Sequence, residues 1–387
     1  MKKYLLSIAV LLMGTTVLTS CDDDDDDNVN PPHVTCPVDV NLGVYVVNSG
    51  NQSGQIDGGL TYLNAETWAS EKDVFAKANG RSLGITANDG IVYGTKLYIA
   101  VTGENTIEVM DNSTLKSLKQ INTVNAIGEG KGNQPRHFAA GNGCIYVSTF
   151  AGYVAAIDTA TYEVVKTYPT TPETENVNKV YPEGMAVNGN TLYVANSSYG
   201  NGQFPSIGKI DLTTGNVTLF TDELINNPNA VYASGNDLYV LDYGKYDASW
   251  NQVGAGVKKI SGGKVSDVVP ATNMAVAGTK IYTYNAPYTT PATVPSYSVY
   301  DMTTGKTAEF IAADSNDAPF SAAAISADPI RGYVYIASYI KNEDTGYPDY
   351  KANGYLNVYD LNGKLVKTCP TGVGPTAIIQ NTTVVYE

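Results

Sequence analysis

A short apolar segment centred on tyrosine recurs eight times along the 387-residue chain. Successive tyrosines of these segments stand 43 to 53 residues apart. They are Tyr45, Tyr98, Tyr146, Tyr193, Tyr239, Tyr282, Tyr335 and Tyr386. Each period contains several short strand-like runs and no window with helical periodicity. Each repeat is therefore predicted to be a unit of about four β-strands.

Two further features recur with the same period. A run of small residues precedes every tyrosine segment except the first, as at residues 84–87, 184–187 and 322–325. Small side chains suit strands that crowd a central axis, so these runs are predicted to be innermost strands. A third strand ends in a turn that starts with Asp and carries Gly, as at residues 211–215, which suits a tight hairpin into the outermost strand.

The number of segments predicts a closed ring. There are seven inner, seven third and seven outer strands, but eight tyrosine segments. The first blade then begins at its second strand, near Tyr45, and takes its inner strand from residues 376–379. The segment at Tyr386 is left over, either extending the last hairpin or competing for the same edge. The predicted fold is all-β: a seven-bladed β-propeller over residues 36–387, with circular closure between the N- and C-terminal strands.

The N-terminus has the pattern of an export signal. Lys2 and Lys3 precede an apolar stretch that is too short for a permanent membrane span. It ends in a lipobox, so residues 1–20 are predicted to be a lipoprotein signal peptide and Cys21 the lipidated first residue. Residues 21–35 are predicted to form an acidic flexible tether. Its six aspartates, 22–27, resemble the surface-export signal of gut-type Gram-negative lipoproteins, which implies a lipid-anchored protein exposed on the outer membrane.

The cysteines allow one hypothesis about the chain ends. Cys144 begins a predicted strand and is interpreted as a small buried hydrophobic residue. Cys36 precedes the first strand, and Cys369 lies near the C-terminus. Exported proteins keep disulfides, and a Cys36–Cys369 bond would join the two ends, although spacing alone does not establish a pairing.

Composition narrows the function classes. The formal net charge is −14 and only three residues are arginine, so no cationic footprint for nucleic acid is present. Only two histidines occur, which argues against a zinc hydrolase or a Ser-His-Asp enzyme. Glu183 and Asp242 could approach each other as a glycosidase pair, but nothing distinguishes them from loop acids. No enzyme activity, metal site or cofactor is predicted, and membrane contact is expected only through the lipid.

One face of the predicted ring carries long loops rich in Tyr, Asn, Ser and Gly, a composition typical of adaptable recognition surfaces. The candidate ligand-binding residues on this face are Arg81, Arg136, Phe150, Tyr181, Asn196, Tyr199, Tyr243, Trp250, Asn285, Tyr288 and Tyr339. Both arginines are expected near the rim of the central channel, and a structural ion pair with an acid of a neighbouring blade is an equal alternative for each.

The repeats resemble a known family. Residues 193–196 (Tyr-Val-Ala-Asn) and 45–48 (Tyr-Val-Val-Asn), together with the Asp-Gly turns, resemble the YVTN-repeat, YncE-like propellers over roughly residues 38–387. This resemblance implies the fold, whereas propellers host many unrelated activities.

The lipobox, the acidic run, the seven repeats and the Tyr/Asn-rich face together are similar to the BtuG family of cobalamin-binding surface lipoproteins. The resemblance implies capture of cobalamin or another corrinoid and its delivery to a TonB-dependent, BtuB-like outer-membrane transporter. Cobalamin would be a transported ligand and not a cofactor. Two alternatives stay open: a glycan-binding surface lipoprotein, and a propeller scaffold that docks other proteins.

Overall fold

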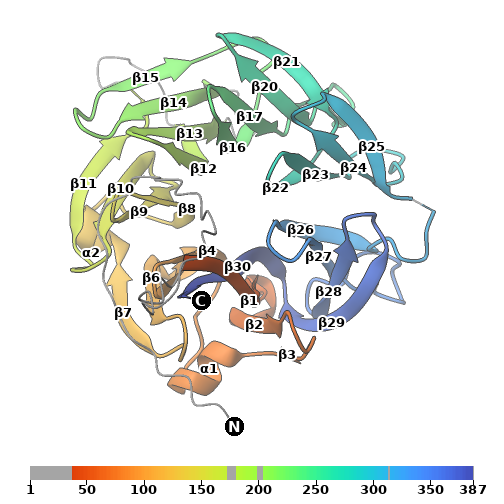
Figure 1. The fold of residues 1–387 in the computed structure, drawn as a ribbon, viewed down its shortest axis with the longest axis horizontal. Helices are drawn as coiled ribbons and strands as arrows, with labels where there is room; N and C mark the ends of the chain where they lie inside the picture. The colour runs from red at the N-terminus through yellow and green to blue at the C-terminus, as the bar shows by residue number, and fades with distance from the viewer. Residues whose placement is uncertain (1–36, 172–179, 198–203, 313, 387) are drawn as a thin grey trace, which may run out of the picture.

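The computed structural model describes residues 37–171, 180–197, 204–312 and 314–386. Seven four-stranded antiparallel sheets stand around a central axis, each with one edge strand facing the axis (Figure 1). The predicted seven-bladed β-propeller is therefore confirmed. Cys21, Cys36 and Tyr199 lie outside the described residues, so lipidation and the Cys36–Cys369 disulfide stay predictions.

Six blades are built from strands that follow one another in the chain. The second and third blades, from the axis outward, are β4 (Ala87–Tyr93), β5 (Lys96–Val101), β6 (Thr106–Asp111) and β7 (Ser117–Asn122), then β8 (Pro135–Gly141), β9 (Cys144–Thr149), β10 (Tyr153–Asp158) and β11 (Val164–Pro169). The fourth and fifth are β12 (Tyr181–Asn188), β13 (Thr191–Ser197), β14 (Ser206–Asp211) and β15 (Val217–Phe220), then β16 (Pro228–Ser234), β17 (Asp237–Asp242), β20 (Gly256–Ser261) and β21 (Lys264–Val269). The sixth and seventh are β22 (Asn273–Ala277), β23 (Lys280–Asn285), β24 (Ser296–Asp301) and β25 (Lys306–Ile311), then β26 (Ser321–Asp328), β27 (Tyr333–Tyr339), β28 (Asn353–Asp360) and β29 (Leu365–Val373).

The first blade closes the ring with strands from both ends of the chain. Its inner strand is β30 (Pro375–Tyr386), followed by β1 (Pro37–Asn48), β2 (Gly59–Asn64) and β3 (Ser70–Glu71). The predicted circular closure is confirmed. Tyr386 pairs with Pro37 in the same ladder, so the eighth tyrosine segment extends the inner strand and does not compete for its edge.

Several short elements lie in the loops between the blade strands. They are α1 (Val74–Asn79), α2 (Thr123–Ile127), the 3-10 turns η1 (Gln52–Gly54) and η2 (Thr102–Glu104), and a hairpin of β18 (Lys245–Tyr246) and β19 (Gln252–Val253). The hairpin is inserted between the second and third strands of the fifth blade. Among the described residues, no helix has the length and apolar character needed to cross a membrane.

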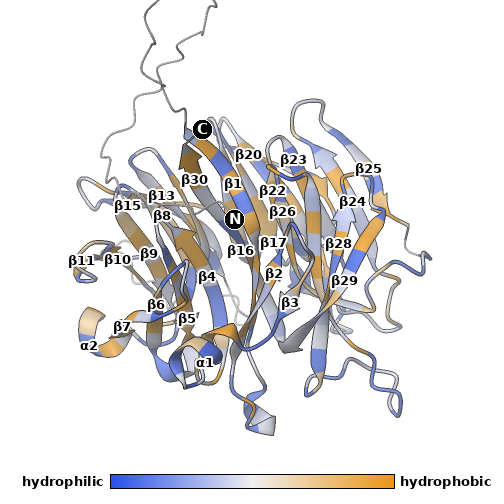
Figure 2. Ribbon diagram, turned by 60° about the horizontal axis from the view of Figure 1, so that its bottom comes forward, coloured by the Kyte–Doolittle hydropathy of each residue, from blue (hydrophilic) through white to orange (hydrophobic). Residues whose placement is uncertain are grey.

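The hydrophobic core lies between blades. Seven clusters of buried residues occur in the described chain, one at each contact between neighbouring blades. Hydrophobic residues are concentrated on the strands (Figure 2). The first seven repeat tyrosines, from Tyr45 to Tyr335, belong to these clusters or pack against them, and Tyr98 and Tyr335 are fully buried. The recurring tyrosine is therefore a packing residue that fills the space between two sheets.

Local sequence explains the turns, with one correction. The side chain of Asp211 accepts hydrogen bonds from the backbone N–H groups of Thr213 and Thr214, and Gly215 has a φ of 83°. This confirms the predicted Asp-Gly hairpin. The prediction of an inner strand at 84–87 was wrong, because β4 begins only at Ala87 and Gly84 instead accepts a bridge hydrogen bond from Gly58.

Candidate functional site

A cavity of about 720 Å³ lies in the mouth of the central channel. All seven inner strands contribute to its wall, mostly through residues in their first halves. The second strands end near the same level, since Ser197 closes β13 and Tyr243 directly follows β17. The cavity therefore opens on the face that carries the long second-to-third loops. Its volume is in the range of about 300–1,000 Å³ that is typical of small-molecule sites.

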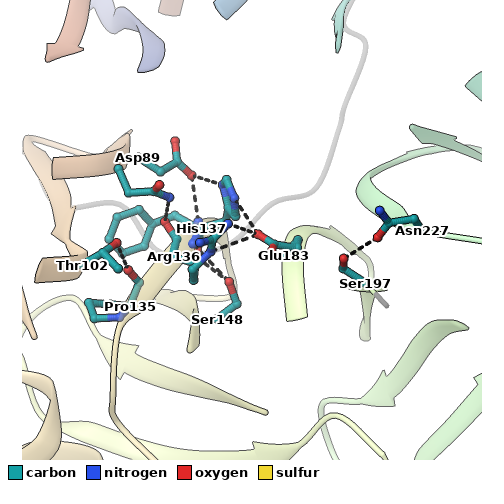
Figure 3. Close-up of polar contacts among 11 residues, drawn as sticks. Asp89, Thr102, Pro135, Arg136, His137, Ser148, Glu183, Ser197 and Asn227 are labelled. Atoms are coloured by element: carbon teal, nitrogen blue, oxygen red, sulfur yellow. Dashed lines mark hydrogen bonds and ion pairs between the residues drawn. The ribbon is translucent and has the colours of Figure 1, made fainter. Parts of the chain in front are cut away.

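Four charged side chains from three blades form one network in this wall (Figure 3). Oε2 of Glu183 accepts from Nη2 of Arg136 at 2.6 Å and from Nε of Arg136 at 3.0 Å. Nε2 of His137 lies 3.1 Å from the same Oε2, and Nδ1 of His137 lies 3.1 Å from Oδ2 of Asp89. The network joins β4, β8 and β12 across two gaps between blades.

The network holds its histidine in the charged form. Burial alone would lower the pKa of His137, but hydrogen bonds to Asp89 and Glu183 and their charges raise it to about 9. Burial alone would raise the pKa of Glu183, but His137 and Arg136 hold it below its usual value. At neutral pH, the protonated His137 has both ring nitrogens engaged and is not free to accept a proton as a general base.

The rest of the wall combines amide side chains with small and aliphatic ones. Amide side chains come from the second, fifth and sixth blades: Asn88, Asn227, Asn229 and Asn273. Small and aliphatic residues form the wall at β26 and β30: Ala323, Ala324, Ile325, Ala377 and Ile378. The two cations and two anions of the network balance each other, so the site favours a ligand that is mainly uncharged, with amide or hydroxyl groups on one edge.

Four of the predicted site residues come together here. Arg136 lines the cavity, and its guanidinium lies 5.9 Å from the ring centre of Phe150. Phe150 stacks on Tyr181 with ring centres 4.3 Å apart. Tyr243 lines the cavity on the other side of Glu183, and burial together with the Glu183 charge raises its pKa to about 12.

Arg81 and Asn196 have structural roles away from the cavity. The guanidinium of Arg81 binds both carboxylate oxygens of the buried Glu108 at 2.8 Å. Arg81 therefore forms a structural ion pair, the alternative to ligand binding. Its partner belongs to the second blade, which Arg81 precedes, and not to a neighbouring blade. Asn196 is fully buried and donates to the backbone oxygen of Thr170. Its amide ties β13 to the segment that follows the outer strand of the third blade.

The remaining predicted residues lie on the rim. Trp250 and Tyr288 are 74% and 64% exposed. Tyr339 is partly buried and meets Tyr350 edge-on at 4.8 Å. Asn285 lines a second cavity, of about 460 Å³, together with Gln252 of β19 and residues of β20 and β21.

The sequence analysis did not identify Asp89 or the four asparagines that line the cavity. Asp89 is the third residue of β4, the strand whose start was placed too early, and the asparagines resemble ordinary loop residues in the sequence. Asp242 does not line the channel cavity. Its carboxylate accepts hydrogen bonds from the backbone N–H groups of Asn226, Asn227 and Gly244. Within the described ranges, no group of three or more His, Cys, Asp or Glu residues could hold a metal ion.

Comparisons with solved structures agree on the fold. A quinonprotein alcohol dehydrogenase-like protein from Bacteroides thetaiotaomicron aligns with a TM-score of 0.60 and 16% identity, covering 88% of this chain and 78% of that one. The hydrazine synthase of Kuenenia stuttgartiensis aligns with a TM-score of 0.56 and 16% identity, over 78% of this chain and 95% of that one. A candidate 6-phosphogluconolactonase from Bacteroides uniformis aligns with a TM-score of 0.56 and 11% identity, covering 89% of this chain and 99% of that one.

These identities are low, so the likeness concerns the propeller fold and not an activity. No curated protein matches the chain. A family model does match it, over residues 42–372, which is nearly the whole ring from the second strand of the first blade to the last strand of the seventh. The chain therefore belongs to the DUF5074 family, described as a domain of unknown function.

Proposed function

We propose that this protein captures a small, mainly uncharged ligand at the long-loop mouth of its central channel and holds it without chemical conversion. The observation that carries the proposal is the 720 Å³ cavity, to which all seven inner strands contribute. Its charges are neutralised by one another, and amide side chains are left to recognise hydrogen-bonding groups. A rigid ring holds these groups in place before binding, which reduces the entropy lost on capture.

A corrinoid such as cobalamin is the first candidate ligand. A corrin is a broad, partly apolar disc fringed by amides, and the cavity offers both amide side chains and small apolar residues. A corrinoid is larger than the drug-sized molecules that fill a cavity of this volume, so part of it would project from the channel. The resemblance to the BtuG family supports the same ligand.

The N-terminal features complete the proposal. Lipid on Cys21 anchors the protein to the outer surface of the outer membrane, and the aspartates that follow act as a flexible tether. The tether keeps the propeller close to a TonB-dependent transporter and raises its effective concentration there. The captured corrinoid then passes to that transporter.

The test uses the mature chain with Cys21→Ala, so that no lipid is attached. The protein is mixed with excess cyanocobalamin, desalted, and its visible absorbance is read against protein concentration. We expect the corrinoid to elute with the protein in near-stoichiometric amount. Folded but colourless protein would overturn the corrinoid assignment, and a glycan array would then test the sugar-binding alternative.

A further inference from the structure

The β18–β19 hairpin stands at the edge of the channel cavity and carries two exposed aromatic side chains. Tyr246 lines the cavity and is 49% exposed. The indole of Trp250 lies beside it, with ring centres 6.3 Å apart and planes tilted by 48°. These two rings continue the wall of the cavity outward onto the rim.

Trp250 has no packing role that would explain its conformation. Its side chain is 74% exposed, and its backbone has a φ of 63°, in the left-handed region that bulky residues rarely adopt. Such strain persists only where the surroundings enforce it, and it concentrates at binding sites. Here the turn is enforced by Asp247, whose carboxylate accepts from the backbone N–H groups of Ser249 and Asn251 at 2.8 and 2.9 Å.

The hairpin is also fixed to the next blade. The backbone N–H of Gln252 donates to the oxygen of Tyr288 at 2.7 Å, and the N–H of Tyr288 donates to Oε1 of Gln252 at 3.0 Å. The N–H of Thr290 donates to Oδ1 of Asn251 at 2.8 Å. Three hydrogen bonds between blades therefore hold the aromatic pair in position before any ligand arrives.

We propose that Tyr246 and Trp250 form a second subsite, which contacts a flat, partly apolar part of the ligand that projects from the channel. This inference rests on the proposed function, because it needs a ligand larger than the cavity. The ligand class is an amphiphilic molecule with a planar face and an edge of amide or hydroxyl groups. The channel recognises the polar edge, and the hairpin contacts the planar face.

The test measures cyanocobalamin binding by isothermal titration calorimetry with Tyr246→Ala, Trp250→Ala and the control Tyr347→Ala. Tyr347 is 73% exposed, like Trp250, but lies in the loop between β27 and β28 and does not line the cavity. We expect each hairpin variant to raise Kd about tenfold, because each removes an aromatic ring that contacts the ligand. The control should bind as the unaltered protein does.

Thermal unfolding checks that all three variants are folded. Unchanged affinity in both hairpin variants would overturn the subsite while leaving the channel site intact, and the exposed aromatics would then fit a protein-docking surface. An equal loss in Tyr347→Ala would also overturn it, since the effect would not be specific to the hairpin. If the unaltered protein does not bind cyanocobalamin, the proposed corrinoid function fails, and the subsite with it.

Discussion

Nε2 of His137 lies 3.1 Å from Oε2 of Glu183, so a side chain of β8 binds one of β12 across the gap between two blades. Glu183 is only 1% exposed, while His137 is 26% exposed toward the channel. The pair therefore stabilises the ring and shapes the cavity wall at the same time. A mutation of either residue should therefore change both the stability of the fold and the shape of the site.

Glu183→Gln should destabilise the protein by about 3 kcal/mol, because it leaves Arg136 and His137 without their shared carboxylate in a buried position. Urea unfolding of the variant and the unaltered protein measures the difference. Glu71→Gln is the matched control: Glu71 also forms an ion pair, with Lys77, but both partners are more than half exposed. That control should change stability by about 0.5 kcal/mol or less, and similar losses in both variants would contradict the prediction.

The raised pKa of His137 predicts a fall in stability at alkaline pH. The folded-state pKa is about 9, and the usual value is 6.5. Protonated His137 is favoured in the folded state, so its contribution is complete below about pH 6.5 and is lost as the pH rises through 9. The loss over this window should be about 2–3 kcal/mol.

Calorimetric melting between pH 6 and 9 measures this fall, below the range in which buried tyrosines titrate. His137→Gln should be less stable at pH 6 and should show a much flatter pH profile. A variant whose stability falls as steeply as that of the unaltered protein would show that another group is responsible.

Circular closure predicts a further sensitive position, Asn41 on β1. Its amide donates to the buried Oδ2 of Asp328, at 2.7 Å, and its backbone oxygen accepts from Nε of Arg331 at 2.6 Å. These bonds join the closing strand to the seventh blade. Asn41→Ala leaves a carboxylate oxygen of Asp328 without this donor and should cost about 1–3 kcal/mol.

Chemical denaturation of Asn41→Ala checks this value. Asn188→Ala is the control, because Asn188 donates to the backbone oxygen of Gly235, also between two blades, but is exposed. We expect a change within about 0.5 kcal/mol for that surface residue. If Asn41→Ala is equally mild, the contact at Asp328 does not contribute to closure.

The fold could be predicted from sequence because its determinants recur. One tyrosine in each repeat fills the space between two sheets, and the excess tyrosine segment revealed the closure. The site residues follow the repeat period, but their residue types differ from blade to blade. Asp89, His137 and Glu183 stand 46 to 48 residues apart, and their contact depends on the exact register of each inner strand. An error of a few residues at the start of β4 was enough to hide Asp89.

The two arginines show the same limit. Arg136 is the second residue of β8 and reaches the cavity, whereas Arg81 lies six residues before β4 and turns to β6. In the sequence, both simply precede or begin an inner strand. Their difference arises from strand boundaries, which the periodic pattern of hydrophobic residues does not define closely.

These arginines provide a matched test of the proposed site. Each binds a glutamate that is 1% exposed, and each guanidinium lies near a phenylalanine ring, Phe75 for Arg81 and Phe150 for Arg136. Arg81→Met and Arg136→Met should therefore both destabilise the protein, by about 1–3 kcal/mol, because each removes the guanidinium from a buried carboxylate. The loss is limited because Glu183 keeps His137, and Glu108 keeps Ser117 and Gln120, as partners. Only Arg136 lines the channel cavity, so only Arg136→Met should weaken cyanocobalamin binding, by about tenfold or more. Equilibrium dialysis measures the affinities, at a temperature where circular dichroism shows that both variants are folded. Equal affinities of the two variants would show that the ligand does not bind in the channel.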